Sequence, residues 1–591
     1  MEQKWIFRIK TEDLKDFEEM AKSAKKMGAT HVMVGDLKRS RWMWEKDLTD
    51  PYTNWSMGHA QLFKLVCPPQ LKPYLPAEHI AECMELVEKR CKILKQYGLK
   101  PALFSNEPFW LPEEAYRDHP EWRGARCDHP RRSKKPYYSP CIDQEEVLSM
   151  YRFAMKELTA RTGIDFFTFM SNDSGGGLCW SSGTYVGPNG PAHCKNRKMS
   201  DRICGFLDAL SDGARDSGVD AVIHFNTDID FKAPETAAAA IWPMLKEHQL
   251  VNKKDCHGNE AIVSILDLGG PEKPILKIPR AVQFVQFLLK ARKASAPYVI
   301  CDIPRSDFEE TAVCFEAARG EPLESLADCG PVLKKAAEKL AGAGYGGQLS
   351  DAWYLIEESY QHLSHTGLDL LMYGCQHQRW INRPFVLFPE ELSEEDRSYY
   401  RRFQFQALTE EETNDLMNLQ GIEGVRGFTS SFLITQTMNK AVKSMAEAIS
   451  LLGKLESEEG SSIDKDKLEL LIRRLKAESC FFRNIVNAVQ FQELVDRTDF
   501  EQSPVLSLRW PTREDMRFEE FQNIVRAEVE NAYALADVLE GYEDQLLLHT
   551  DAEHEDIFVF GPDFVKQLRR KAEIMLDHIG EGSRVYVSHN I

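Results

Sequence analysis

The sequence predicts an α/β protein: a (β/α)₈ TIM barrel over residues 1–389, followed by an α-helical domain over residues 390–591. Two observations support this. Over about the first 300 residues, short apolar runs alternate with amphipathic helical patterns, which indicates a parallel sheet with right-handed crossovers. After about Pro389, apolar residues recur with the period of a helix and strand patterns stop.

The strands can be assigned in chain order. The apolar run Phe166–Met170, bounded by turn-forming residues, is typical of a strand buried on both faces. Similar runs predict strands at Trp5–Ile9, Thr30–Val34, Lys100–Phe104, Ala221–Phe225, Ala261–Leu266 and Tyr298–Cys301, with Asp369–Tyr373 as the candidate eighth strand. Amphipathic patterns predict helices between them at Glu12–Met27, Ala77–Tyr97, Gln144–Thr162 and Ser200–Ser217.

A doubly wound sheet is the alternative to the barrel. Such a sheet would normally carry a G-x-G-x-x-G phosphate loop after an early strand, and the glycines after Asp173 do not form one. The barrel is therefore favoured.

The last 200 or so residues predict a helical bundle, packed against the barrel or against a second copy in a homodimer. The apolar stripe Leu468, Leu471, Ile472, Leu475 and Phe482 has the spacing of a buried helix face. The predicted helices are Glu390–Met417, Thr437–Leu455, Asp464–Gln492, Thr512–Glu540 and Pro562–His578.

Composition narrows the class of partner. The 591 residues are 43% apolar and 28% charged, and the net charge of −19 comes without a long basic tract, which argues against nucleic acid as a partner. No apolar run approaches the ~20 residues of a membrane span. The 14 cysteines form no tight framework and the N-terminal segment lacks a secretory apolar core, so a cytoplasmic location is predicted. No cofactor is expected.

Acidic residues follow the predicted strands. In a (β/α)₈ barrel the carboxyl ends of the strands meet at one rim, where catalytic groups lie. Some of these residues will instead cap helices, and Asp173 has the context of a simple Asx turn. The residues at the strand ends are Asp36, Glu107, Asp173, Asp228, Asp267 and Asp302.

The predicted rim loops are long and aromatic. Trp and Tyr rings stack on sugar rings, while Asp, Asn and Arg bind hydroxyl groups, so these loops suggest a carbohydrate cleft. The alternative is that the tryptophans, such as Trp110 and Trp180, pack the loops onto the barrel.

Several short motifs resemble bacterial barrel glycoside hydrolases of the broad β-hexosaminidase-like and α-glucuronidase-like assemblage. They are His119-Pro-Glu-Trp-x-Gly124, Pro140-Cys141, and Asn172-Asp173 followed by Cys179. The resemblance covers about residues 1–390 and implies a glycosidase. The chain departs from true hexosaminidases at the fourth strand, where Asn172-Asp173 replaces an Asp-Glu pair, so substrate-assisted cleavage is not implied.

Glycoside hydrolysis needs a proton donor and a second group that serves as base or nucleophile. Asp173 is the predicted acid, its partner is Glu107, Asp302 or Asp267, and His129 is a further candidate base. An exo-acting enzyme on an oligosaccharide is expected. The predicted substrate-binding residues are Asn172, Trp180, Arg39, Arg41, Trp110, Arg126, Asp36, Asn226, Asp267 and Gln376.

Arginines in the predicted rim loops suggest an acidic terminal sugar, uronic or sialic, because guanidinium groups bind carboxylates bidentately. The alternative is an internal network with the abundant Asp and Glu. The arginines are Arg39, Arg41, Arg123, Arg126, Arg131 and Arg132.

Two other classes of function stay open. One is a metal-dependent sugar isomerase or deacetylase, or a loop-stapling zinc site, although the cysteine spacing matches no short paired zinc motif. The other is a non-catalytic carbohydrate-binding barrel. The possible zinc ligands are Cys127, His129, Cys141, Cys179, His193 and Cys194.

Overall fold

The computed structural model describes residues 3–9, 11–37, 39–44, 58–127, 136–171, 193, 197–226, 240–265, 275–302, 308–366, 380–403, 428–497, 511–547 and 560–583. These residues form two compact units, each described by itself. The first comprises Met1–Gly270 and Phe284–Asp328, and the second Pro271–Gln283 and Cys329–Ile591. The predicted boundary after residue 389 stays a prediction.

The first unit is built on an eight-stranded sheet whose neighbouring strands are all parallel, in the order β8-β7-β6-β3-β2-β1-β10-β9. Its strands are β1 (Lys4–Arg8), β2 (His31–Met33), β3 (Lys100–Asn106), β6 (Phe166–Met170), β7 (Val222–Asn226), β8 (Gln249–Val251), β9 (Ile262–Ile265) and β10 (Tyr298–Asp302). A separate hairpin pairs β4 (Arg123–Arg126) with β5 (Tyr138–Pro140).

The seven strands assigned from the sequence are confirmed in position. The eighth strand of the described sheet is β8, which was not predicted because only Leu250 and Val251 give it an apolar character. The candidate eighth strand Asp369–Tyr373 lies outside the described residues.

The sheet is strongly curled. The rings of Phe166 on β6 and Tyr298 on β10 are 5.2 Å apart, although these strands are four places apart in the sheet. In a flat sheet that separation would be about 19 Å. One buried apolar cluster takes a residue from every strand, which places it on the concave face: Ile6, Met33, Ala102, Phe166, Val222, Leu250, Ile262 and Ile300.

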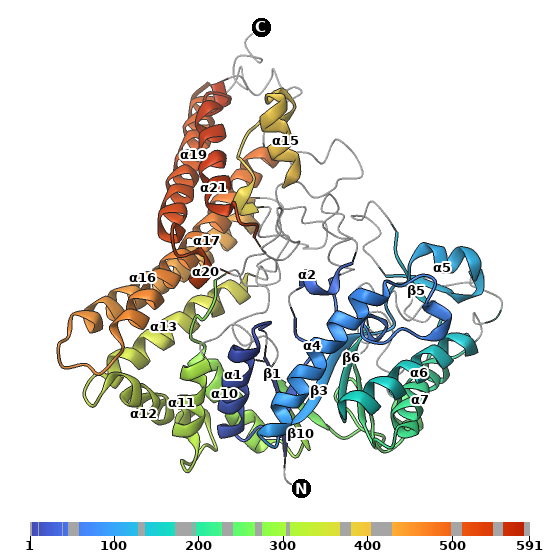
Figure 1. Ribbon diagram of the computed structural model, residues 1–591. Coiled ribbons are helices and arrows are strands. Elements are labelled where there is room, and N and C mark those ends of the chain that lie inside the picture. Colours follow the sequence, from blue (N-terminus) through green and yellow to red (C-terminus); the bar gives the residue numbers. More distant parts are fainter. Residues whose placement is uncertain are drawn as a thin grey trace. The chain divides into compact units, whose positions relative to one another are not determined.

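Helices cover the opposite, convex face of this sheet (Figure 1). Ring contacts run outward from Phe225 on β7 through Phe206 to Tyr151 and Phe63. Asp13 caps the first helix by accepting hydrogen bonds from the backbone amides of Lys15 and Asp16. The helices of this unit are α1 (Leu14–Lys26), α2 (Arg39–Trp42), α4 (Ala77–Gln96), α5 (Glu113–Asp118), α6 (Glu145–Thr162), α7 (Met199–Asp216), α10 (Ala281–Lys293, whose first turn belongs to the second unit) and α11 (Phe308–Ala318). Short 3₁₀ turns are η1 (Leu62–Lys64), η2 (Pro69–Leu71), η3 (Pro120–Trp122), η5 (Trp242–Met244) and η6 (Leu326–Asp328).

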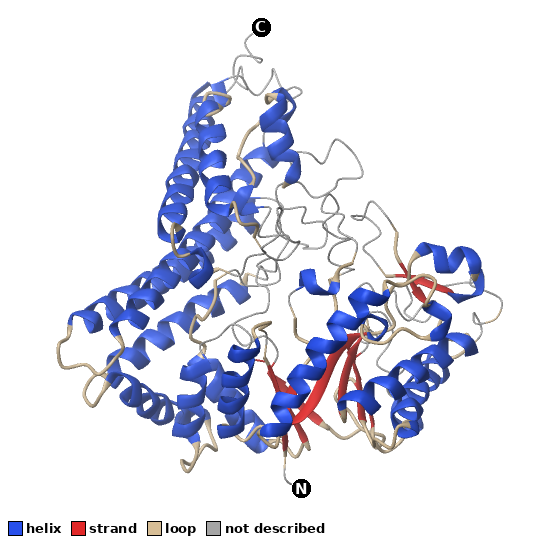
Figure 2. Ribbon diagram, viewed as in Figure 1, coloured by secondary structure: helices blue, strands red, loops and turns tan. Residues whose placement is uncertain are grey.

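Within the described residues of the second unit, the named elements are all helices or 3₁₀ turns joined by loops, as Figure 2 shows by colour. The apolar stripe predicted from the sequence is in its core, with Leu468, Leu475 and Phe482 almost fully buried. Among the described residues, no helix is long and apolar enough to cross a membrane. The elements are α12 (Cys329–Ala341), α13 (Gly346–His365), η8 (Pro389–Glu391), α15 (Glu394–Arg402), α16 (Phe428–Ser457), α17 (Lys465–Arg497), α19 (Pro511–Leu539), α20 (Glu543–Leu546) and α21 (Phe564–Asp577).

Candidate functional site

The concave face of the sheet changes from apolar to polar toward the carboxyl ends of its strands. Side chains two residues apart on a strand share a face. The residue two positions after each member of the apolar cluster therefore also faces inward. Here these positions are mostly polar. We call the following set the concave polar layer: Arg8, Thr168, His224, Ser264 and Asp302, with Asn106 and Asn226 one step further on and Asp36 after β2.

Arg8 joins two of the predicted rim carboxylates. Its Nε lies 2.6 Å from Asp36 Oδ1, and its Nη1 lies 3.0 Å from Asp302 Oδ2. The guanidinium stacks on the ring of Phe104, 4.3 Å from its centroid. Asp302 is fully buried and Asp36 is 5% exposed. Each carboxylate therefore uses one oxygen on Arg8, and among the described residues Asp36 Oδ2 and Asp302 Oδ1 are left buried without a hydrogen-bond partner.

Arg90, on α4, holds the end of β2 in place. Its Nη1 donates to the carbonyl oxygens of Val34 at 3.1 Å and Asp36 at 3.0 Å, and its Nη2 donates to Thr11 O. Burial lowers the pKa of Arg90 to about 10, so the group remains charged at neutral pH. A fully buried guanidinium thus fixes the backbone from which the Asp36 side chain extends.

Deeper on the concave face, His224 is neutral. Burial, and to a lesser extent the charge of Lys253, lowers the pKa of His224 to about 3. Its Nδ1 lies 3.4 Å from Thr168 Oγ1, and its Nε2 has no partner in the described ranges. Asn106 Oδ1 and Ser264 Oγ are likewise buried without partners. Because an unsatisfied buried polar group costs about 1–3 kcal/mol, several of them on one face indicate that a polar ligand or water belongs there.

The Glu107 side chain lies on the opposite face of the sheet from that of Asn106, the face that Leu103 and Ser105 share. It is fully buried, and its Oε1 accepts hydrogen bonds from the Leu62 amide at 2.5 Å and Ser105 Oγ at 3.0 Å. Its Oε2 accepts from Tyr151 Oη at 3.1 Å. Burial raises the pKa of Glu107 to about 8. The side chain is enclosed between β3 and the residues packed on its convex side.

Trp110 is 2% exposed and packs in an aromatic cluster. Its ring lies 5.4 Å from that of Trp44 and 5.3 Å from that of Tyr137. The buried Lys64 ammonium lies 5.5 Å from the Trp44 ring and 5.8 Å from the Trp110 ring. These contacts favour the packing interpretation of Trp110 that the sequence left open.

Two of the predicted sugar-binding arginines have acidic neighbours. Arg41 lies 3.8 Å from Glu12, and Arg123 pairs with Glu113 while its guanidinium stacks 4.5 Å from the Tyr138 ring centroid. These pairs favour the internal network for Arg41 and Arg123. Arg39 begins α2 and Arg126 ends β4, but their side chains lie outside the description.

Of the other predicted site residues, Asn226 ends β7 on the concave side. The remainder lie outside the described residues: Asp173, His129, Asn172, Trp180, Asp228, Asp267, Gln376, Arg131 and Arg132. Arg8 and Arg90 were missed by the sequence reasoning. The signal for Arg8 was its spacing from Ile6, which places a guanidinium on an otherwise apolar strand face.

The possible zinc ligands are partly brought together. Cys141 Sγ lies 3.6 Å from His193 Nε2, whereas Cys127 is buried in the aromatic cluster. His129, Cys179 and Cys194 lie outside the described residues. Within the described ranges, no three or more His, Cys, Asp or Glu residues gather closely enough to hold a metal ion.

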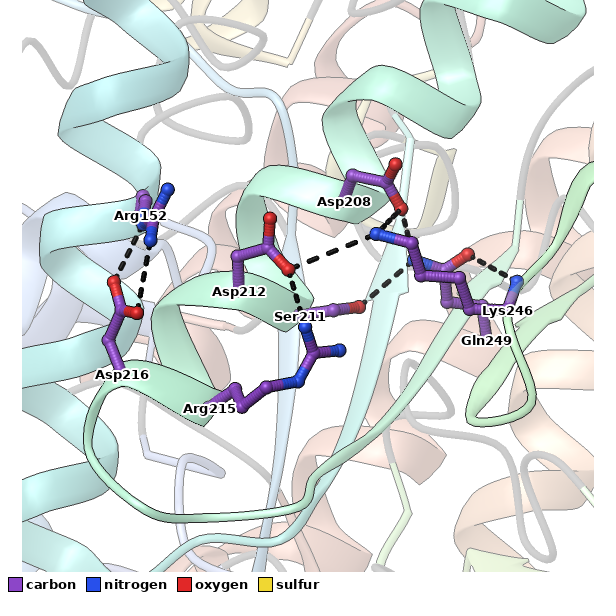
Figure 3. Close-up of polar contacts among 8 residues, drawn as sticks. All are labelled: Arg152, Asp208, Ser211, Asp212, Arg215, Asp216, Lys246 and Gln249. Atoms are coloured by element: carbon purple, nitrogen blue, oxygen red, sulfur yellow. Dashed lines mark hydrogen bonds and ion pairs between the residues drawn. The ribbon is translucent and has the colours of Figure 1, made fainter.

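A second polar region lies at the amino-terminal ends of β7 and β8, where a cavity of about 280 Å³ opens beside Arg215, Lys246 and His248. Figure 3 shows that the neighbouring basic groups are paired. Arg215 lies 2.9 Å from Asp212, Lys246 lies 2.8 Å from Asp208, and outside the view His248 lies 3.1 Å from Asp220. In (β/α)₈ barrel enzymes the amino-terminal end of the sheet serves stability rather than chemistry.

Comparison with known proteins gives a fold and no family. No family model matches the chain, and no curated protein matches it. Among solved structures, it is similar to a GH138 enzyme targeting pectin rhamnogalacturonan II, with a TM-score of 0.52 at 8% identity over 98% of this chain and 84% of that one.

Weaker likenesses also involve glycoside hydrolases. For CpGH89 from Clostridium perfringens, in complex with GlcNAc-alpha-1,4-galactose, the TM-score is 0.43 at 10% identity over 98% of this chain and 63% of that one. For a GH36 alpha-galactosidase, AgaA from Geobacillus stearothermophilus, it is 0.31 at 12% identity over 54% and 42%. The TM-score of 0.52 with the GH138 enzyme shows a shared fold.

Proposed function

We propose that this protein is a glycoside hydrolase whose chemistry takes place at the carboxyl ends of the curled sheet. The observation that carries this proposal is the concave polar layer, in which buried polar atoms without partners face the position where barrel enzymes bind substrate. The fold shared with a GH138 enzyme supports the same reaction class. We further propose that β8 and β9, the two edges of the sheet, close it into a (β/α)₈ barrel.

For the catalytic pair we keep Asp173 as the acid. Among its described candidate partners, Asp302 lies on the concave side and is ion-paired to Arg8, whereas Glu107 is enclosed on the other side of β3. A charged carboxylate suits the base or nucleophile rather than the proton donor. Asp302 is therefore favoured over Glu107, with Asp267 and His129 as further candidates.

The substrate part of the proposal is narrower. We propose an exo-acting enzyme, of the hexosaminidase-like or glucuronidase-like kind, on an oligosaccharide with an acidic terminal sugar. Asp36 and Asn226 on the concave side are the described binding candidates. The remaining support for an acidic sugar comes from Arg39, Arg126 and their neighbours in sequence rather than from Arg41 or Arg123.

An activity screen on chromogenic glycosides, including glucuronides, sialosides and N-acetylhexosaminides, tests the proposal. We expect turnover of at least one glycoside, and loss of about 10²–10⁴-fold in kcat in Asp173→Asn and Asp302→Asn. Asp165→Asn is the matched control, because Asp165 pairs with Lys100 and His31 at the amino-terminal end of the same sheet. Sugar binding without any turnover would instead indicate a non-catalytic barrel.

A further inference from the structure

We propose that Arg8, Asp36 and Asp302 form a polyol-binding subsite, in which Asp36 Oδ2 and Asp302 Oδ1 each accept a hydrogen bond from a hydroxyl group of the ligand. That the ligand is the terminal sugar of a substrate rests on the proposed function. The hydroxyl-binding chemistry itself rests on the geometry alone.

The first step is the supply of acceptors. Arg8 occupies Asp36 Oδ1 and Asp302 Oδ2 at 2.6 Å and 3.0 Å, and the second oxygen of each carboxylate is buried and has no partner within the described part of the chain. An ionised carboxylate accepts hydrogen bonds and cannot donate them. The complementary ligand therefore brings donors, and hydroxyl groups are the compact neutral donors that a sugar offers.

A second observation points to a ligand on the same face. Asn106 and His224, each 4% exposed, also direct side chains to the concave side and carry the unpaired atoms Asn106 Oδ1 and His224 Nε2. These two residues are not acidic, so the subsite is more than a cluster of carboxylates. Together the unpaired atoms offer several hydrogen-bonding positions on the concave face of one sheet.

The third step is charge. The two carboxylates share the guanidinium of Arg8, and the other nearby cation, Arg90, binds the backbone carbonyl of Asp36 rather than its carboxylate. The oxygens Asp36 Oδ2 and Asp302 Oδ1 therefore present negative charge to a ligand, and the described neighbours Asn106, Thr168, Asn226 and Ser264 are uncharged. Opposite charges attract strongly where water is excluded. A cationic polyol should therefore bind better than a neutral one. By the same reasoning, the carboxylate of an acidic sugar would have to bind away from Asp36 and Asp302.

Three small molecules with the same branched skeleton separate hydroxyl recognition from charge. Tris carries three hydroxyls and an ammonium group, pentaerythritol carries four hydroxyls and no charge, and tert-butylammonium carries the charge without hydroxyls. Binding to the full-length protein would be measured by calorimetric titration at pH 7 in phosphate buffer. We expect Tris to bind at least tenfold more tightly than either of the other two.

The variants Asp36→Asn and Asp302→Asn should each weaken Tris binding about tenfold or more, which corresponds to ~1.4 kcal/mol. Asp165→Asn should leave it unchanged, and thermal unfolding would verify that each variant is folded. Equal binding of Tris and tert-butylammonium, or unchanged Tris binding in folded Asp36→Asn, would overturn the proposal. This assay needs no turnover. If the protein bound Tris but cleaved no glycoside, the proposed hydrolase function would be contradicted and the polyol-binding subsite would stand.

Discussion

Glu107 shows how burial sets the protonation of a single residue. Its raised pKa, about 8, means that the carboxyl is largely protonated at pH 7 in the folded protein. In the unfolded chain it ionises near its ordinary value of 4.5. The stability that this proton contributes is fully present below pH 4.5 and is lost as the pH rises through about 8.

The substitution Glu107→Gln should therefore change the pH dependence of stability. Gln is close in shape and can still accept from the Leu62 amide and meet Tyr151. Between pH 5 and pH 9 the wild-type melting temperature should fall relative to that of the variant. Parallel thermal unfolding curves across this range would test it. Lys64, whose pKa burial lowers to about 7, titrates in both proteins, and its attraction to Glu107 is the smallest of the causes that shift either pKa, so most of its contribution is common to both. A constant difference in melting temperature would show that Glu107 is charged when folded.

Arg8 stabilises buried carboxylates by pairing with them, whereas Glu107 is stabilised by protonation. Arg8 neutralises part of the charge of Asp36 and Asp302. Arg8→Met would leave Asp36 and Asp302 buried without their cation. Removal of one partner from a buried ion pair costs about 3–5 kcal/mol. Urea unfolding should show a loss of this order, and Arg8→Lys should restore part of it. Full stability in Arg8→Met would mean that the carboxylates are protonated or reach water.

The sequence predicts these residues unevenly. Asp36 and Asp302 could be found because they follow apolar strands, and the structure shows both beside the concave face. Glu107 has the same strand-end signal, but its side chain faces the convex layer. Counting by twos from Ala102 would have separated Asn106, on the concave side, from Glu107. Parity along β3 therefore separates Asn106 from Glu107. It does not apply to Asp36, which lies three residues beyond the end of β2.

At the scale of elements, the end of β2 depends on α4. Arg90 donates hydrogen bonds to the carbonyl oxygens of Val34, Asp36 and Thr11. Arg90→Met should leave these carbonyls unpaired and loosen the segment that carries Asp36. We expect Tris binding to weaken several-fold more than in Asp165→Asn at a temperature where both variants are folded. Equal affinities would indicate that the β2 end holds its position without Arg90.

The helical unit contains a buried polar network between helices distant in sequence. Lys571 Nζ donates to Glu528 Oε1 at 2.5 Å and to Ile381 O at 2.9 Å, and the amides of Asn484 and Asn487 donate to the two Glu528 oxygens at 2.7 Å each. Lys571 and Glu528 are fully buried. The sequence predicted the apolar stripes of these helices but not this network, because helical periodicity does not reveal which polar positions face each other.

This network should make single and double substitutions differ. Lys571→Met leaves the Glu528 charge buried, so a loss of about 3–5 kcal/mol is expected. The double variant Lys571→Met with Glu528→Gln removes both charges and keeps a side chain that Asn484 and Asn487 can bind, so it should regain part of that loss. Urea unfolding of both variants gives the comparison. A double variant less stable than the single one would show that Glu528 is stabilised by other groups.

At the scale of the molecule, alternation of strands and helices predicted the parallel sheet, while the short β8 escaped prediction. Three residues carry too few apolar positions to be recognised as a strand. The chain also leaves the first compact unit at residue 270 and returns to it at 284. The assignment of residues 271–283 to the second unit depends on contacts distant in sequence, and no local sequence pattern encodes such contacts.

The placement of residues 271–283 in the second unit predicts how fragments of the chain will behave. The segment Pro271–Gln283 belongs to the second unit, where the Leu276 amide donates to Leu546 O at 2.8 Å and Arg280 Nε lies 3.2 Å from Glu357 Oε2. A fragment of residues 1–328 keeps the sheet but loses both partners, leaving Arg280 without its carboxylate and the apolar Ile275 and Ile278 exposed. Burial of such side chains is worth about 1.5–3 kcal/mol each.

We therefore expect the 1–328 fragment to unfold at a lower temperature than the full chain and to bind the dye ANS. A fragment of residues 1–389 keeps Glu357 but loses Leu546, so it should be intermediate. Light scattering, dye fluorescence and thermal unfolding of the three proteins would measure this order. If the 1–389 fragment matched the full chain in melting temperature, the pair Arg280–Glu357 would suffice to hold residues 271–283 in place. The boundary expected from the sequence would then describe the stable domain better than the compact units do.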